Sequence, residues 1–320
     1  MRLAPASVPT LAEWVARVEF TPLRTEVRAG WTCFNPTLVR RRDGRLVAGV
    51  RSSNYRLGHL GSYDIDDPRR IVRSESRLVA LDDRLRPEAG VLVAEARDAL
   101  TVESTIRGYE DLRLFESSGG LGALASVRDR DSTGLCRIVL LEIADDGTVT
   151  RERLVAGPDP LLHEKNWVPF DAQAATLRIA YSWDPLVLGL LDLTTGELTL
   201  DAPVASPWGA ARGGAGGVAV GDELLFVVHE SITMPDWTRR YVHRFVTLTS
   251  DGLPSRESTR LTFLSLGIEF ATGMALDGDR LLVSFGREDE EAWIASVRLQ
   301  EVMELMTPVP IAQNAARVPA

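Results

Sequence analysis

The 320-residue chain contains a single lysine against 35 arginines, and it has only two cysteines. Cys33 and Cys136 lie far apart and match no zinc or redox spacing, which argues against a disulfide framework or a thiol-bound metal. The net charge is −9 and no basic block occurs, so we expect neither nucleic acid nor a membrane as a partner. No apolar run approaches the length of a membrane span, and residues 1–20 are interrupted by prolines and charges, which predicts a cytoplasmic protein.

The one lysine, Lys165, stands between two apolar runs in the segment 163–167, His-Glu-Lys-Asn-Trp. An ammonium group is a compact point donor, whereas a guanidinium is a planar fork, so the two are not interchangeable. In a chain that otherwise uses arginine, its presence here indicates a group that grips an anion or a sugar hydroxyl. The alternative is a surface lysine retained by chance.

The sequence repeats one pattern five times: a short segment, then two apolar strand-like runs joined by turns. The short segments are residues 34–39, 109–115, 165–170, 213–220 and 269–276. The first runs are 44–51, 120–128, 176–182, 222–230 and 279–286, and the second runs are 76–81, 137–143, 186–193, 241–248 and 292–299. Repeated units of three or four antiparallel strands with few helical patterns predict an all-β fold, a five-bladed β-propeller.

We therefore expect an N-terminal segment at 1–29 with a short amphipathic helix at 10–19, a propeller at 30–305 and a C-terminal tail at 306–320. In a propeller the first strand of each blade lines the central axis, so the polar residues that open these strands converge at one end of the channel. Burying them requires a ligand, water or each other. A binding pocket satisfies this requirement, and a ring of mutual ion pairs is the alternative.

The order of short motifs in this chain resembles glycoside hydrolase family 130, which comprises mannoside phosphorylases and some mannosidases on a five-bladed propeller. The resemblance covers roughly residues 30–300, with about one motif per blade. Its motifs here are Asn35-Pro36, Arg51, Glu110-Asp111-Leu112-Arg113, Lys165, Gly213-Gly214, His229, Tyr241, Glu269, and Gly286 with Asp289. The family signature has proline where this chain has Leu112.

The resemblance implies that Asp111 is the general acid, whose proton reaches the glycosidic oxygen through a hydroxyl of the bound sugar. A neighbouring Glu110 would raise the pKa of this carboxyl and Arg113 would lower it. The alternative is a structural pair between Asp111 and Arg113, which lie two residues apart on one strand face.

The resemblance also implies that a basic cluster holds inorganic phosphate as co-substrate, with no other cofactor and no metal. Arginines, Lys165 and His229 suit this role because several charge-assisted donors must offset the desolvation of a dianion. We therefore predict an inverting glycoside phosphorylase acting on small β-mannoside-like oligosaccharides. Arg137 is a further candidate for the cluster.

Two alternatives stay open. An inverting hydrolase would need Glu230 or Glu269 opposite Asp111 as general base for water. A sugar-binding propeller without catalysis would use the carboxylates only to hold hydroxyls. A nucleotide-sugar transferase is disfavoured because no Asp-x-Asp metal motif has a suitable pocket context, and residues 64–67 are typical of an exposed turn. The number of subunits is open, and a homo-oligomer is compatible with the sequence.

The catalytic candidates are Asp111, Glu110, Glu269 and Glu230. The candidates for binding substrate or phosphate are Asn35, Arg51, Arg113, Arg128, Lys165, Asn166, Arg212, His229, Tyr241, His243 and Asp289.

Overall fold

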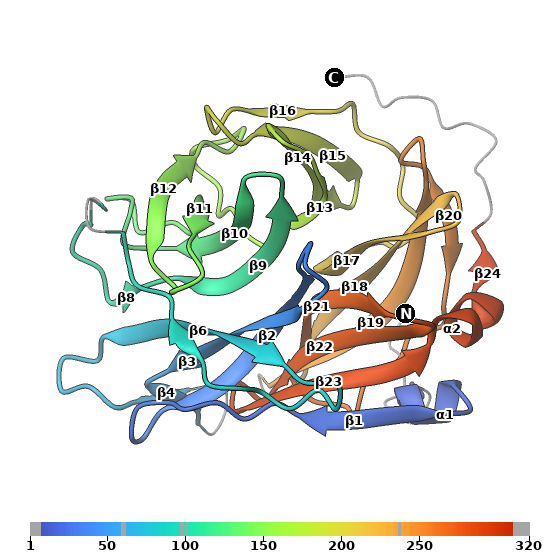
Figure 1. The fold of residues 1–320 in the computed structure, drawn as a ribbon, viewed down its shortest axis with the longest axis horizontal. Coiled ribbons are helices and arrows are strands. Elements are labelled where there is room, and N and C mark those ends of the chain that lie inside the picture. Colours follow the sequence, from blue (N-terminus) through green and yellow to red (C-terminus); the bar gives the residue numbers. More distant parts are fainter. Residues whose placement is uncertain (1–7, 59–61, 97–98, 100, 236–237, 310–320) are drawn as a thin grey trace.

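Five small antiparallel sheets surround a common axis, as predicted, in a five-bladed β-propeller (Figure 1). The structure is a computed structural model, and it describes residues 8–58, 62–96, 99, 101–235 and 238–309. The innermost strands are β2 (Thr32–Arg40), β9 (Glu110–Ser117), β13 (Val168–Ala172), β17 (Arg212–Val220) and β21 (Glu269–Asp277). These are the five short segments of the sequence repeat. Each packs against the innermost strands of the two neighbouring blades, which closes the ring.

The two apolar runs of each repeat form the next two strands outward, also as predicted. The second strands are β3 (Leu46–Ser53), β10 (Gly120–Val127), β14 (Thr176–Trp183), β18 (Glu223–Thr233) and β22 (Arg280–Arg287). The third strands are β6 (Val72–Leu81), β11 (Arg137–Ile143), β15 (Leu186–Asp192), β19 (Arg239–Thr249) and β23 (Glu291–Arg298). The outermost strands are β7 (Val91–Leu92), β12 (Val149–Val155), β16 (Leu198–Leu200), β20 (Pro254–Glu257) and β1 (Val18–Pro22).

The N-terminal segment is part of the propeller rather than an external addition. The helix expected over 10–19 is confined to α1 (Leu11–Trp14), and the chain then becomes strand β1. This strand pairs antiparallel with β23, from Val18 opposite Val297 to Pro22 opposite Trp293, and completes the last blade. Pairing with an open sheet edge overrides the weak local preference for helix, because it satisfies a whole row of backbone groups. The ring is thus closed by strands from both ends of the chain.

The C-terminal region also returns to the sheet. Helix α2 (Leu299–Leu305) follows β23, and β24 (Thr307–Pro308) pairs with β20 of the fourth blade. The predicted tail therefore begins as an extra strand, and residues 310–320 of it lie outside the described residues. Neither helix in the described part of the chain is long and apolar enough to cross a membrane.

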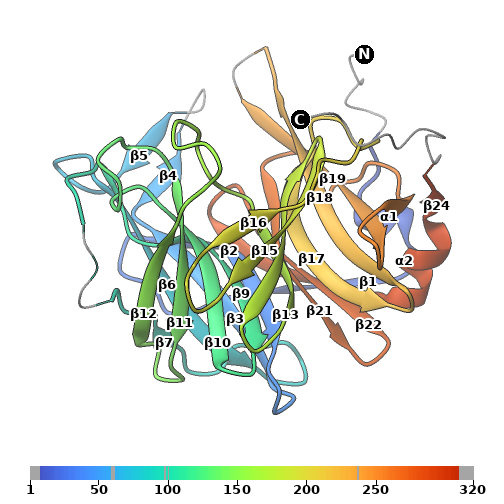
Figure 2. The ribbon, with the colours of Figure 1, turned by 90° about the horizontal axis from the view of Figure 1, so that it is seen from above.

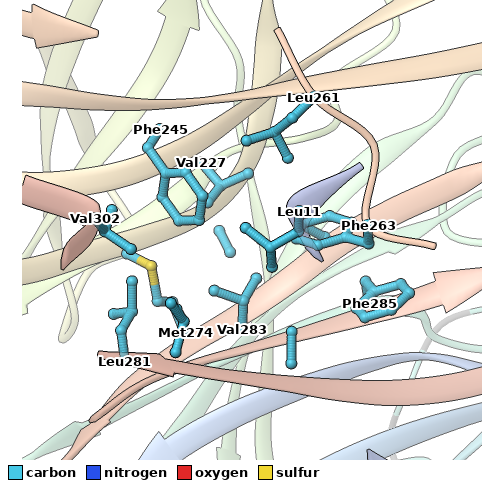
Figure 3. Packing of buried hydrophobic residues seen from close by; sticks show 14 of the residues in the cluster. Leu11, Val227, Phe245, Leu261, Phe263, Met274, Leu281, Val283, Phe285 and Val302 are labelled. Carbon is cyan, nitrogen blue, oxygen red and sulfur yellow. The ribbon is translucent and has the colours of Figure 1, made fainter. Parts of the chain in front are cut away.

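A large apolar cluster lies between the fourth and fifth blades (Figure 3). Leu11 of α1 and Val302 of α2 reach into it and are fully buried, so both helices are fastened to the core by their apolar side chains. Phe245, Phe263 and Phe285 fill its centre, and Phe263 stacks on Phe285 with ring centroids 4.4 Å apart. This packing fixes the blade that carries β21, one wall of the central channel.

Two hairpins rise beyond the blades on the same side of the ring (Figure 2). One is β4 (Tyr55–Leu57) with β5 (Tyr63–Ile65), inserted between the second and third strands of the first blade. The other is the extended end of β18 and β19, whose pairing runs from Glu223 opposite Thr249 to Thr233 opposite Arg239. A further short strand, β8 (Ile106–Arg107), pairs parallel with β6. The hairpins build the wall of the cavity described next.

Candidate active site

A polar cavity of about 160 Å³ lies at the end of the channel where the innermost strands begin. It takes residues from all five blades, as the convergence argument predicted. The predicted residues that line it are Asn35, Arg51, Glu110, Asp111, Arg128, Lys165, Asn166, Arg212, His229, Tyr241 and Asp289. The lining residues that were not predicted are Tyr55, Leu57, Tyr63, Ser126, Cys136, Arg239, Ile268 and Phe270.

Backbone irregularities aim the polar side chains into this cavity. The register between the first and second strands slips after Phe34 in the first blade, and a similar slip places Asp111 in a bulge of β9. Asn35 and Asp111 have positive φ values of 46° and 50°, and Asn166 has 64°. Such a conformation is costly for residues other than glycine, although Asn and Asp tolerate it best. Three strained residues at one cavity are typical of a functional site.

A glycine on the neighbouring blade makes room for one of these residues. A Cβ atom at Gly286 would lie 2.0 Å from Oδ1 of Asn35, so no larger residue fits without moving it. Gly286 is one of the residues that carry the family resemblance. The close approach of the Asn35 side chain to its backbone explains why this position is a glycine.

Arg51 is the centre of the acidic side of the cavity. Its Nη1 donates to Oδ1 of Asp111 at 2.8 Å, and its Nη2 lies 2.6 Å from Oε1 of Glu110. The guanidinium also donates to Oγ of Ser74 and lies over the ring of Phe34, 5.0 Å from the centroid. Arg51 is 5% exposed, so these contacts fix it and the two carboxylates in one arrangement.

Asp111 is held as a carboxylate by its neighbours. Its Oδ1 also accepts a hydrogen bond from Nδ2 of Asn35 at 2.9 Å. Burial raises the pKa of Asp111, but Arg51 and the hydrogen bond from Asn35 outweigh it and place the pKa below its usual value. Arg51 therefore supplies most of the lowering that the sequence attributed to Arg113. A role as general acid requires a ligand that shifts this balance.

Asp289 is the third carboxylate of the acidic side. Its Oδ2 accepts a hydrogen bond from the hydroxyl of Tyr55 at 2.9 Å, and its φ value is 52°. Burial raises the pKa of Asp289 to about 6, although Arg51 and Tyr55 oppose the change. Asp289 thus titrates near neutral pH beside two carboxylates held by Arg51.

This shift predicts a pH-dependent effect of Asp289→Asn on stability. Because the folded protein holds this proton more tightly than the unfolded chain, stability is present at pH 4 and is lost as the pH rises through 6. Relative to wild type, the Asn variant should gain on the order of 2–3 kcal/mol between pH 4 and pH 7 in denaturant unfolding. Asp111→Asn is the matched contrast, since its lowered pKa makes the difference run in the opposite direction. A difference in the free energy of unfolding between wild type and Asp289→Asn that does not change with pH would contradict the prediction.

The basic side of the cavity comes mostly from the third and fourth blades. It carries Arg128, Lys165, Arg212 and Arg239, and no carboxylate pairs with any of them among the described residues. Elsewhere on the surface, arginines commonly form ion pairs, as Arg28 does with Glu75 and Arg86 with Asp82. Unpaired cations gathered in one cavity create a site of positive potential on a protein of net charge −9.

His229 lines the cavity from β18, where it lies opposite Arg212 of β17, and it is 3% exposed. Burial lowers its pKa well below the usual value, and His243 together with nearby cations, including Arg113 and Arg212, lowers it further. The imidazole is therefore neutral at pH 7 and acts as a hydrogen-bonding group rather than a cation. Its Nδ1 is buried and has no hydrogen-bond partner within the described structure.

Two of the predicted binding residues do not reach the cavity. Arg113 lies beneath its floor, stacked 5.1 Å from the centroid of Phe270, with Nη1 donating to the carbonyl of Thr272 at 3.3 Å. The bulge at Asp111 breaks the strand alternation that would have placed Asp111 and Arg113 on one face. His243 is 1% exposed and packs on Phe263, with ring centroids 4.6 Å apart. Both residues belong to the core.

The two proposed general bases also lie elsewhere. Glu230 forms ion pairs with Arg244 and Arg260, away from the cavity. Glu269 is fully buried, and its carboxylate accepts hydrogen bonds from the backbone N–H groups of residues 263–265. The expectation that either faces Asp111 is therefore wrong, because each carboxylate is already engaged by a structural partner. Arg137, also suggested for the basic cluster, instead donates to the carbonyls of Pro160 and Leu162.

Half of the lining residues that the sequence did not reveal, four of eight, come from the two raised hairpins. Tyr63 is 47% exposed and packs edge-to-face on Tyr55, with centroids 5.2 Å apart. Arg239 lies at the start of β19. These hairpins are not part of the five-fold repeat, so periodicity gave no signal for them. The clue in the sequence was the presence of aromatic residues in an insertion within the first repeat, between its second and third strands.

The other end of the channel holds a larger cavity of about 340 Å³, lined by the far halves of the innermost strands. Its lining is mostly apolar, and Arg40 and Glu116 within it are paired with Asp277 and Arg41. The reactive groups therefore concentrate in the smaller cavity. In the described part of the chain, no three His, Cys, Asp or Glu side chains are grouped to hold a metal ion.

The chain has the fold of solved sugar-active propellers but no detectable relative by sequence. It matches no protein-family model and no curated protein. A β-1,2-mannobiose phosphorylase from Listeria innocua, solved with β-1,2-mannobiose, is 12% identical with a TM-score of 0.60, covering 89% of this chain and 96% of that one. A mannose phosphorylase from Leishmania mexicana, solved with a phosphate ion, is 12% identical with a TM-score of 0.54, covering 95% and 94%.

A third structure comes from work on family 130 mannoside phosphorylases and on glycoside hydrolases that target β-1,2 mannosidic linkages. It is 11% identical with a TM-score of 0.57, covering 92% of this chain and 97% of its own. These similarities confirm the five-bladed fold that the resemblance implied. At this identity they establish the fold alone, and the activity has to be argued from the cavity.

Proposed function

We propose that the protein is an inverting glycoside phosphorylase that cleaves a small β-mannoside-like saccharide with inorganic phosphate. The observation that carries the proposal is that one cavity holds both a group of carboxylates and a group of cations. Asp111, Glu110 and Asp289, with Arg51, come from the first, second and fifth blades, whereas cations without a carboxylate partner among the described residues come mostly from the third and fourth blades. A sugar needs carboxylates for its hydroxyls and an acid for its leaving group, whereas a dianion needs several cationic donors.

In this reaction a phosphate oxygen attacks the anomeric carbon from the face opposite the leaving group. The bond from that carbon to the glycosidic oxygen breaks, and this oxygen takes the proton of Asp111, relayed by a sugar hydroxyl. The products are a sugar 1-phosphate with inverted configuration and a free saccharide. A phosphate dianion beside the cavity raises the pKa of Asp111 by like-charge repulsion, so phosphate binding and protonation of the acid support each other.

Both carboxylates that were proposed as the general base of a hydrolase, Glu230 and Glu269, have structural roles instead. A hydrolase would have to use Asp289, which lies close to Arg51 and Asp111, since both of them affect the pKa of Asp289. An inverting base must instead face the acid across the sugar, with the carboxyl groups about 6.5–9.5 Å apart.

The test is NMR detection of products from a panel of β-linked mannosides and glucosides, with and without inorganic phosphate. We expect a sugar 1-phosphate that forms only when phosphate is present. Free sugar formed equally in both samples would overturn phosphorolysis in favour of hydrolysis. Saturable saccharide binding without any product would support a binding module.

Lys165→Met is expected to raise the KM for phosphate by about 10- to 100-fold, which corresponds to one lost charge-assisted hydrogen bond of about 1.5–3 kcal/mol. Initial rates across a phosphate series measure this. Arg84→Met, which removes one exposed positive charge outside the cavity, serves as the control and should leave KM unchanged. Equal effects of the two substitutions would show that Lys165 acts only through net charge.

A further inference from the structure

Lys165 and Asn166 reach the cavity from a segment without regular secondary structure, residues 156–167 between β12 and β13. The side chain of Lys165 is exposed and has no ion-pair partner among the described residues. Its position is therefore set by the backbone that carries it. A phosphate site requires that backbone to be rigid, because a mobile lysine pays a larger entropy cost for each hydrogen bond formed.

The second blade holds one side of this segment. The backbone N–H of Cys136 donates to Nδ1 of His163 at 2.9 Å, and the backbone N–H of Glu164 donates to the carbonyl of Cys136 at 2.8 Å. Arg137 donates to the carbonyls of Leu162 and Pro160 at 2.8 and 2.6 Å. The segment is thus fastened to the start of β11 up to Glu164.

The side chain of Glu164 holds the other side to the third blade. Its Oε2 accepts a hydrogen bond from Nε1 of Trp167, and its Oε1 accepts one from the hydroxyl of Tyr181, both at 3.1 Å. The rings of Trp167 and Tyr181 pack with centroids 5.3 Å apart. A Cβ at Gly157 would lie 2.0 Å from Oε1 of Glu164, so a glycine is needed where the chain passes this carboxylate.

Burying the carboxylate of Glu164 is energetically unfavourable, which is unusual for a purely structural contact. It is 3% exposed, and no cation forms an ion pair with it in the described structure. Burial raises the pKa of Glu164, and the hydrogen bonds from Tyr181 and Trp167 only partly oppose this. An apolar side chain would fill the same space without desolvating a carboxylate. What an apolar residue could not do is accept hydrogen bonds from Trp167 and Tyr181 at once, close in sequence to Lys165.

We propose that Glu164 is a positioning residue for the anion site, which fixes Lys165 and Asn166 against the cavity by tying Trp167 and Tyr181 together. The inference rests on the proposed function, since it assigns Lys165 to phosphate. It adds a residue that never touches the ligand and yet determines how tightly the ligand is held.

The test compares the KM for phosphate and kcat in Glu164→Ala, Glu164→Gln and wild type. Glu164→Ala frees the segment, so the KM for phosphate should rise at least tenfold while kcat at saturating phosphate stays within about threefold. Glu164→Gln should stay within about threefold of wild type in both. Its amide oxygen can accept from Trp167, and its amide N–H can donate to the hydroxyl oxygen of Tyr181.

Glu152→Ala is a matched control. Glu152 is a buried carboxylate of the second blade that also accepts a hydrogen bond from a tyrosine hydroxyl, that of Tyr109, but it lies outside the cavity. The Glu152→Ala substitution should lower the melting temperature without changing the KM for phosphate. If Glu164→Ala does not fold, Tyr181→Phe removes one of the two hydrogen bonds and should give a smaller rise in the same constant.

Two outcomes overturn the inference. If Glu164→Ala, or Tyr181→Phe in its place, has a wild-type KM for phosphate, the hydrogen bonds of Glu164 to Trp167 and Tyr181 do not position the site. If the KM for phosphate rises equally in Glu152→Ala, lost stability alone explains the rise in Glu164→Ala. Calorimetric titration with inorganic phosphate separates this inference from the proposed function. An absence of binding to wild type would contradict both the inference and the proposed function. Equal binding to wild type and to Glu164→Ala would contradict only the role of Glu164.

Discussion

Asp111→Asn should reduce kcat/KM for phosphorolysis by about 10²- to 10⁴-fold, the range expected when a general acid is lost. The asparagine oxygen can still accept hydrogen bonds from Asn35 and Arg51, so the geometry in which Asp111 is held at 2.9 and 2.8 Å is preserved. What is lost is the proton that leaves with the glycosidic oxygen. The measurement is the initial rate of sugar 1-phosphate formation at saturating phosphate.

Circular dichroism and thermal melting of the same variant provide the control for folding. Saccharide binding should persist within about tenfold, because the hydrogen bonds to sugar hydroxyls do not require a charge. Near-normal turnover by a folded Asp111→Asn protein would remove Asp111 from the reaction and, with it, the assignment of the acidic side.

Glu269→Ala should have the largest effect on stability, a loss of about 3–5 kcal/mol in denaturant unfolding. The carboxylate is fully buried and accepts hydrogen bonds from the backbone N–H groups of Phe263, Leu264 and Ser265 at 2.6, 2.8 and 2.9 Å. Alanine would leave three backbone donors without a partner, that of the buried Phe263 and those of the part-buried Leu264 and Ser265, and a buried donor left in this way costs about 1–3 kcal/mol. Phe263 also fills the core between the fourth and fifth blades (Figure 3), so the loop cannot move out without opening that core.

The exposed Glu142, paired at 3.3 Å with Arg151 on the surface, is the control. Glu142→Ala should cost less than about 1 kcal/mol, as is usual for a solvent-exposed ion pair. A Glu269→Ala protein of wild-type stability that has lost turnover would restore Glu269 as a catalytic residue and contradict its structural role.

The strands and their grouping were predictable because their causes are local. Each blade repeats apolar runs of strand length separated by turn residues, and these signals act over a few positions whatever the rest of the chain does. The helix expected over 10–19 failed for the opposite reason. Residues 18–22 are recruited by the free edge of β23, a partner almost 280 positions away that no local pattern reveals.

The site divides in the same way. The five-fold repeat was enough to predict that Asn35, Asp111, Lys165 and Arg212 meet at one end of the channel, because they open equivalent strands. Their partners were not predictable. Whether Arg51 or Arg113 holds Asp111 depends on a bulge that turns Asp111 out of the strand alternation. Arg239 and Tyr63 come from hairpins outside the repeat.

The sequence by itself thus determined the five blades, the end of the channel where polar groups gather, and most residues of both sides of the cavity. Only the tertiary structure decided which of those polar groups are free to act. Glu269, Glu230 and Arg137 look like reactive groups in the sequence, but each is engaged by backbone or side-chain partners from distant segments. A charged group acts on a ligand only where the fold places it in the cavity, and that placement depends on contacts made in three dimensions.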